Sequence, residues 1–120
     1  MMNINEIMIG DWILDGYQYA QVTGITCDGN IETTANANSN IELLEPITIT
    51  SEILEKNGFK QEDDDCYLWN ENLERIIWFD GGYTVITSVR CDRMYEGHCY
   101  DVHEFQHLLD LCGINKKIIV

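Results

Sequence analysis

The sequence predicts an α+β fold, and three kinds of pattern support this prediction. Runs rich in β-branched and aromatic residues alternate with polar residues, as in half-buried strands. Turn sequences such as Asp28-Gly29 and Asp80-Gly81-Gly82 separate these runs. Two amphipathic segments carry helix start and stop signals. Together these patterns predict an N-terminal small-barrel-like β-meander, a short helix, a three-stranded antiparallel unit and a C-terminal amphipathic helix.

The length of the chain limits the number of domains. A chain of 120 residues can bury one core but is too short for two ordinary domains. We therefore expect residues 1–120 to form a single domain, with a β-rich part over residues 1–49 and an α+β part over residues 50–120.

The N-terminal part begins with the predicted β-meander over residues 7–34. Residues 17–25 alternate in polarity, and the Asp28-Gly29 turn favours a return strand at residues 31–34. Residues 35–40 are small and polar, as in a surface loop. Residues 41–49 are predicted to be extended.

The short helix is predicted from its caps. Pro46 disfavours a helical conformation at Glu45, so the helix is expected to start later, at Thr50 or Ser51. Gly58 is the expected residue after its end, with Phe59 folding back as a hydrophobic contact.

Three strands are predicted in the following part, at residues 66–69, 73–79 and 83–89. Residues 62–65 form a carboxylate run without the spacing of a calcium loop, so we expect a solvated loop there. Residues 91–100 are predicted to be irregular. Residues 114–120 are predicted to form a last edge strand, with Lys116 and Lys117 discouraging pairing with another chain.

Charge and cysteine content bear on partners and location. Seven Lys and Arg residues against twenty-one Asp and Glu residues give a net charge of −14, which disfavours direct binding to nucleic acid. The same charge can attract a basic protein partner. Five scattered cysteines, with neither a secretory leader nor a membrane-spanning run, lead us to expect a cytoplasmic protein.

Three segments resemble uncharacterised small proteins of phages and mobile elements of Bacteroides and related bacteria. The segments are Ile9 to Ile13 (IGDWI), Glu45 to Phe59 (EPITITSEILEKNGF) and Val102 to Leu108 (VHEFQHL). The resemblance implies a common origin and fold, and no established activity comes with it. In those proteins the pattern near the C-terminus matches His103 and Gln106 but not His107, which implies that the second histidine is not a family feature.

Residues 101–113 contain the zinc-protease pattern His-Glu-x-x-His at His103, Glu104 and His107. A zinc hydrolase would use the histidines as ligands and Glu104 to activate water, but it needs a third ligand. The thirteen residues after His107 contain neither His nor Glu. Cys99 and Cys91 are the remaining candidates, and with the two histidines they would suit a small structural zinc site.

The same segment also has the pattern of an ordinary packed helix. Val102, Phe105, Leu108, Leu109 and Cys112 share one face, whereas His103, His107 and Asp110 gather on the polar side. Asp101 and Glu104 match a capping box. We therefore predict no catalytic residues and no cofactor, and expect an acidic, non-enzymatic interaction or accessory protein that acts on a host or phage nucleic-acid enzyme. A zinc hydrolase and a structural zinc site are the alternatives.

Overall fold

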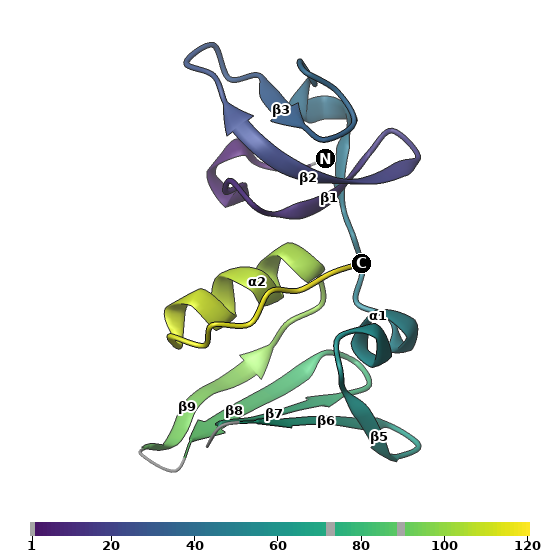
Figure 1. Ribbon diagram of the computed structural model, residues 1–120, viewed down its shortest axis with the longest axis vertical. Coiled ribbons are helices and arrows are strands. Elements are labelled where there is room, and N and C mark those ends of the chain that lie inside the picture. The colour runs from purple at the N-terminus through teal and green to yellow at the C-terminus, as the bar shows by residue number, and fades with distance from the viewer. Residues whose placement is uncertain (1, 72–73, 89–90) are drawn as a thin grey trace. The chain divides into compact units, whose positions relative to one another are not determined.

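The computed structural model describes residues 2–71, 74–88 and 91–120, and of these the side chains of residues 91–94 lie outside the description. It contains two antiparallel sheets and two α-helices, so the predicted α+β class is confirmed (Figure 1). The chain divides into two compact units. Unit 1 comprises residues 1–48, 101–103 and 120, and unit 2 comprises residues 49–100 and 104–119.

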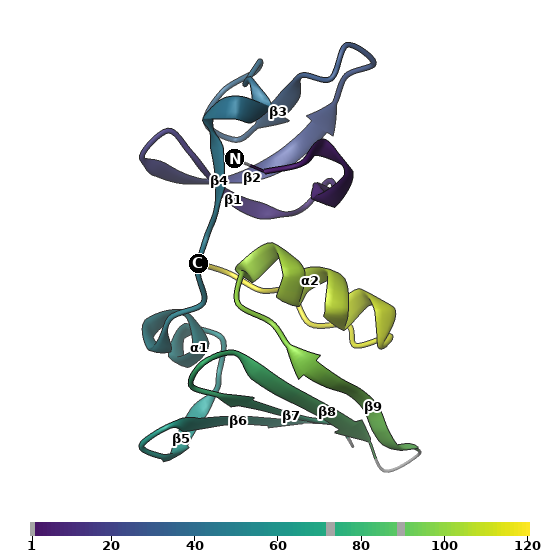
Figure 2. The same cartoon turned by 180° about the vertical axis from the view of Figure 1, so that it is seen from behind.

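Unit 1 is built on a four-stranded antiparallel sheet in the order β3-β2-β1-β4. Its strands are β1 (Trp12–Asp15), β2 (Gln18–Ile25), β3 (Ile31–Thr33) and β4 (Leu44–Pro46), and two 3-10 turns are η1 (Ile4–Glu6) and η2 (Ile41–Leu43). Figure 2 shows β4 beside β1, at the edge away from β3. The predicted meander is present, and Gly29 has a φ of +84° in the predicted turn.

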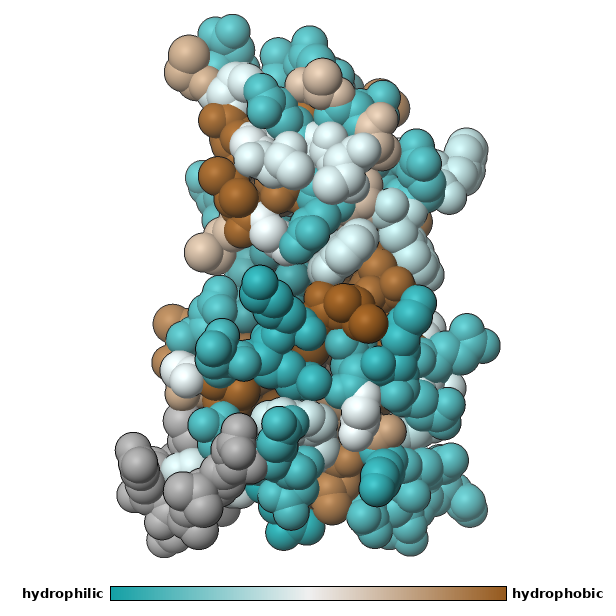
Figure 3. Space-filling view, viewed as in Figure 1, coloured by the Kyte–Doolittle hydropathy of each residue, from teal (hydrophilic) through white to brown (hydrophobic). Residues whose placement is uncertain are grey.

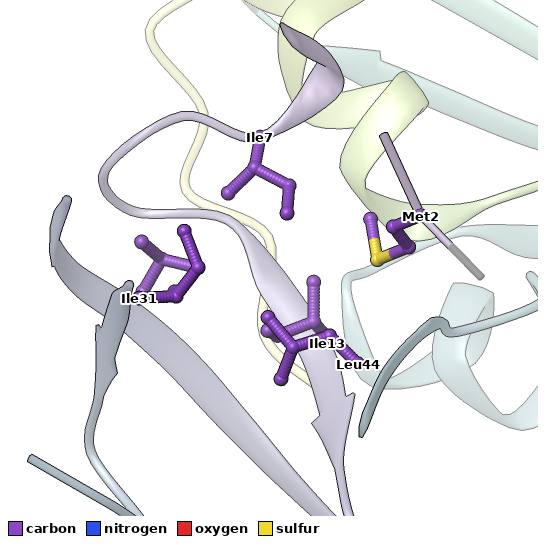
Figure 4. Close-up of a cluster of buried hydrophobic side chains, with 6 residues drawn as sticks. Met2, Ile7, Ile13, Ile31 and Leu44 are labelled. Carbon is purple, nitrogen blue, oxygen red and sulfur yellow. The ribbon is translucent and has the colours of Figure 1, made fainter. Parts of the chain in front are cut away.

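The core of unit 1 gathers side chains from every part of this sheet. Ile13, Ile31 and Leu44 are completely buried, and they come from three different strands. Figure 4 shows these side chains meeting those of Met2 and Ile7, which precede the sheet. Because alternate residues of a strand face opposite sides, this packing leaves Trp12 and Leu14 on the other face of β1.

Unit 2 is built on a five-stranded antiparallel sheet in the order β5-β6-β7-β8-β9. The strands are β5 (Lys60–Asp63), β6 (Cys66–Glu71), β7 (Glu74–Phe79), β8 (Tyr83–Ser88) and β9 (Cys91–His98), and the helices are α1 (Ser51–Lys56) and α2 (Val102–Leu111). Trp69, Ile76 and Ile86 lie side by side on three adjacent strands and are buried. In Figure 1 α2 runs along the sheet, and the ring of Phe105 meets Phe59 edge-on at 6.0 Å.

The sheet is therefore larger than the predicted three-stranded unit. The irregular segment predicted at residues 91–100 was wrong, because β9 pairs with β8 from Cys91 to His98 with a shift in register near Ser88. Much of the predicted loop at residues 62–65 was also wrong, since Glu62 and Asp63 belong to β5. Pairing with a neighbouring strand stabilises the extended conformation of these polar segments, although their own residues do not favour it.

Strand β5 differs from its neighbours because all four of its residues are exposed. It carries part of the acidic run, and the lower right of Figure 3, where β5 lies, is mainly hydrophilic. The strand is held by backbone pairing with β6, as between Gln61 and Tyr67. Across the described residues, no helix is long and apolar enough to cross a membrane.

The predicted boundaries of α1 are confirmed by its caps. Thr50 Oγ1 accepts a hydrogen bond from the Ile53 amide at 3.3 Å. At the other end Gly58 has a φ of +88°, and the amides of Gly58 and Phe59 donate to Glu55 O at 3.1 Å and Leu54 O at 3.0 Å. This paired arrangement satisfies the last carbonyls of the helix.

The C-terminal segment does not form the predicted edge strand. Residues 114–120 have no strand pairing, yet Ile114 and Ile118 are buried. The Lys116 ammonium lies 5.1 Å from the Trp69 ring centroid. This lysine therefore contacts an aromatic ring and does not lie on an edge strand as predicted.

Asn57 ties the C-terminal segment to α1. Its Nδ2 donates to Ile53 O and to Ile119 O, both at 2.7 Å, and its Oδ1 accepts from the Ile119 amide at 2.8 Å. Asn57 is 7% exposed, so these bonds are largely shielded from water. One side chain thus takes the place of a strand partner for the backbone of Ile119.

Replacing Asn57 by Ala is expected to lower the free energy of unfolding by about 2 kcal/mol, because the buried bond to Ile53 O and the two partly buried bonds to Ile119 are lost. Urea unfolding measures this loss, and amide hydrogen exchange at Ile119 should accelerate. The exposed Asn115→Ala in the same segment is the control, with a change below about 0.5 kcal/mol. An equally small change for Asn57→Ala would show that the bonds to Ile119 contribute little.

Candidate functional site

His103 is buried, in contrast to the polar position predicted for it. Its side chain is 2% exposed, and its Nε2 lies 3.5 Å from Glu6 Oε2. Glu6 ends η1 and belongs to unit 1, as does His103. The N-terminal segment therefore contacts His103, and this contact between residues far apart in the sequence explains why the helical pattern alone misplaced the imidazole.

The carboxylate of Glu6 is held in place from two sides. Its Oε1 accepts a hydrogen bond from the Asn3 amide at 2.6 Å, completing a capping box with Asn3. That backbone bond has the largest effect and lowers the pKa of Glu6, burial opposes it, and His103 lowers the pKa further. The buried imidazole thus faces a carboxylate that stays ionised.

The other predicted zinc ligands lie in different surroundings. His107 is half-buried on α2. Cys99 is 2% exposed, and its backbone carbonyl accepts a hydrogen bond from Trp78 Nε1 at 3.1 Å. The side chain of Cys91 lies outside the described residues. Within the part of the chain that the structure describes, no group of three or more His, Cys, Asp or Glu side chains is arranged to hold a metal ion.

A cavity of about 600 Å³ lies in unit 1. It lies beside the tight turn between β1 and β2, where Gly16 has a φ of +70°. Its lining comes from that turn and the strand residues beside it, from the loop after β3, and from η2 and β4. The lining residues are Leu14, Asp15, Gly16, Tyr17, Gln18, Asn36, Glu42, Leu43 and Glu45.

Three carboxylates line this cavity, and none of the lining residues is Lys, Arg or His. Asp15 is buried, whereas Glu42 and Glu45 are exposed. Tyr17 is fully exposed and Leu43 is 64% exposed, so apolar surface accompanies the negative charge. A cavity of this composition favours a ligand with a positive charge and an apolar stem.

Asp15 is the anchor of the site. Its Oδ2 accepts hydrogen bonds from Thr33 Oγ1 and Ser39 Oγ, both at 2.7 Å, and from Asn36 Nδ2 at 3.2 Å. Burial raises the pKa of Asp15, but the bonds from Ser39, Thr33 and Asn36 together outweigh it, so that the pKa is lowered. The charge is therefore retained although the side chain is only 4% exposed.

Two of the donors to Asp15, Asn36 and Ser39, lie in the loop that the sequence predicted only as small and polar, whereas Thr33 ends β3. Thr33 Oγ1 also accepts from the Ala35 and Asn36 amides, at 3.1 Å and 3.0 Å. The Ser39 amide and carbonyl pair with Ile31, which returns the loop to β3. The sequence prediction did not include this site, because Asp15 and its donors lie on segments 18 to 24 residues apart in the chain.

Known proteins offer no guide to the site, because no family model, curated protein or solved structure matches the chain.

Replacing Asp15 by Ala is expected to lower the free energy of unfolding by about 3 kcal/mol at pH 7, since the buried hydroxyls of Thr33 and Ser39 lose a charged acceptor. Folding lowers the pKa of Asp15, so its contribution is present above the ordinary value of 3.8 and is lost as the pH falls through the folded pKa. Urea unfolding should show that the difference in free energy of unfolding between wild type and variant becomes smaller in acid.

The control for Asp15→Ala is Glu45→Ala, which removes an exposed carboxylate from the same cavity and should cost less than about 0.5 kcal/mol. A difference in free energy of unfolding between wild type and Asp15→Ala that stays constant from pH 7 down to pH 2 would contradict a stabilising role of the ionised carboxylate.

The zinc hydrolase and the structural zinc site both require bound zinc, and the zinc content of the protein can be measured directly. We expect protein purified without a metal-affinity tag to contain far less than one zinc per chain, because the described candidate residues do not converge as zinc ligands must. Elemental analysis tests this, with His107→Ala as the matched variant. Stoichiometric zinc that disappears in His107→Ala would contradict the expectation and restore the zinc site.

Proposed function

We propose that this chain is a non-enzymatic interaction protein that binds a basic segment of a partner protein in the cavity of unit 1. The observation that supports it is the lining, which combines three carboxylates with exposed apolar side chains and has no cationic residue. The net charge of −14 adds a long-range attraction for such a partner and a repulsion for nucleic acid.

The three bonds to Asp15 favour binding over a purely structural role for the cavity. A buried carboxylate already fixed by its neighbours does not have to be ordered when a ligand arrives, so less conformational entropy is lost on binding. Glu42 and Glu45 are exposed and add charge at the rim. This division between an ordered anchor and an outer charged rim is typical of recognition sites.

Enzymes that handle nucleic acid are a suitable partner class, because their surfaces carry lysines and arginines for phosphate groups. An acidic protein that occupies such a surface competes with the nucleic acid. We therefore propose that the chain is an accessory factor of a host or phage nucleic-acid enzyme, in keeping with its resemblance to phage and mobile-element proteins. The zinc hydrolase remains the alternative, and it rests on the His103 to His107 motif alone.

Titration of the full chain with a blocked ten-residue peptide of alternating Lys, Arg and Ala tests the binding function. We expect saturable binding by calorimetry that weakens as salt rises, since the rim charges are screened. Combining Glu42→Gln with Glu45→Gln should weaken binding about tenfold, equivalent to about 1.4 kcal/mol.

The matched control combines Glu52→Gln with Glu55→Gln, which removes two exposed charges from α1 in unit 2. It should change the affinity less than about twofold if the cavity is the site. Equal weakening by both double variants would mean that net charge alone attracts the peptide, and absence of saturable binding would refute the proposed function.

A further inference from the structure

We infer that the cavity of unit 1 prefers the primary ammonium group of a lysine side chain over the guanidinium of arginine. This inference rests on the proposed function and goes further, because it names the chemical group that enters the cavity. The preference comes from the way in which the buried carboxylate of Asp15 is already bonded.

The two oxygens of Asp15 differ in what they can still accept. All three hydrogen bonds from Thr33, Asn36 and Ser39 end on Oδ2. A carboxylate offers about four acceptor sites, two on each oxygen, so Oδ2 has no site left for a ligand. Among the bonds that the described residues make, none ends on Oδ1. Asp15 thus keeps one oxygen for a ligand at the cavity that it lines.

A single available oxygen discriminates between the two cationic side chains. Arginine gains most from a carboxylate when two parallel N–H groups meet both oxygens, and Asp15 cannot offer both. Lysine carries a compact charge with three donors that point in different directions. Its ammonium can therefore donate once to Asp15 Oδ1 and use its remaining donors for Glu42, Glu45 or water.

The apolar residues at the cavity fit the stem of the same side chain. Leu14, Tyr17 and Leu43 line the cavity along with the carboxylates. Four methylene groups separate the ammonium of lysine from its backbone, and they can contact such surfaces while the charged end reaches the acid. An ammonium without a stem, or a divalent ion, gains nothing from these residues. A calcium ion also requires six or more oxygen ligands.

The experiment compares blocked pentapeptides Ala-Ala-X-Ala-Ala, where X is lysine, arginine or N-acetyl-lysine, by NMR titration of the full chain. Shifts of the Gly16, Tyr17 and Asn36 amides report on the cavity. We expect the lysine peptide to bind at least about fivefold more tightly than the arginine peptide. The N-acetyl-lysine peptide, which has lost its charge, should give no saturable shift.

A variant of the anchor tests the reason for the preference. Combining Asn36→Ala with Ser39→Ala removes two of the three donors to Oδ2 and leaves the bond from Thr33. One acceptor site on Oδ2 becomes available, so the arginine peptide should gain relative to lysine and the ratio should fall to about twofold or less. Gln18→Ala, at another lining residue whose side chain is not among the donors to the Asp15 carboxylate, is the control and should keep the ratio of the wild type.

Each outcome separates this inference from the proposed function. Equal binding of the lysine and arginine peptides, or tighter binding of arginine, overturns the lysine preference and leaves a basic-segment site in place. Displacement of the lysine peptide by an equal concentration of calcium chloride at constant ionic strength also overturns the preference. Failure of both cationic peptides and of the ten-residue basic peptide to shift the cavity amides overturns the proposed function as well.

Discussion

The hydrogen bonds that end on Asp15 connect β1 of unit 1 to the end of β3 and to the loop that follows β3. A carboxylate at the end of β1 accepts from the last residue of β3 and from two side chains of the loop that follows it, so β1 is connected to residues 18 to 24 positions later in the chain. The same bonds keep the carboxylate ionised in spite of its burial. Without this anchor the loop would lose the side-chain bonds of Asn36 and Ser39 to β1.

Unit 2 is stabilised on a different principle. Its sheet buries a row of large side chains on one face, including Trp69, Trp78 and Ile86. Polar groups contribute mainly where the backbone leaves regular structure, as at Asn57, which meets both backbone groups of Ile119. Apolar packing therefore determines the sheet, and a few buried polar bonds determine how the segments outside it are attached.

Features encoded within a few residues could be predicted from the sequence. The cap of α1 at Thr50, the glycine after its end at Gly58 and the turn at Gly29 depend on side chains and backbone angles of neighbouring residues, and all three were found. The apolar face of α2, with Phe105 and Leu109, also followed from spacing alone.

Features that depend on distant residues could not be predicted. Strand β9 forms because β8 supplies partners, since its own polar residues and Gly97 do not favour a strand. His103 is buried because η1 lies against it, almost one hundred residues earlier in the chain. The residues that line the cavity come from three separate segments, so no local sequence pattern predicts it.

Strand β5 has a consequence for how this sequence can change. Because its four side chains are all exposed, its place in the sheet depends on backbone pairing and not on which side chains it carries. Substitutions that keep the backbone amides and avoid proline should be tolerated there without loss of the fold. The acidic residues of β5 can therefore be replaced during evolution without a change in the fold. Asp15 cannot be replaced in the same way, because its carboxylate is bonded to three side chains.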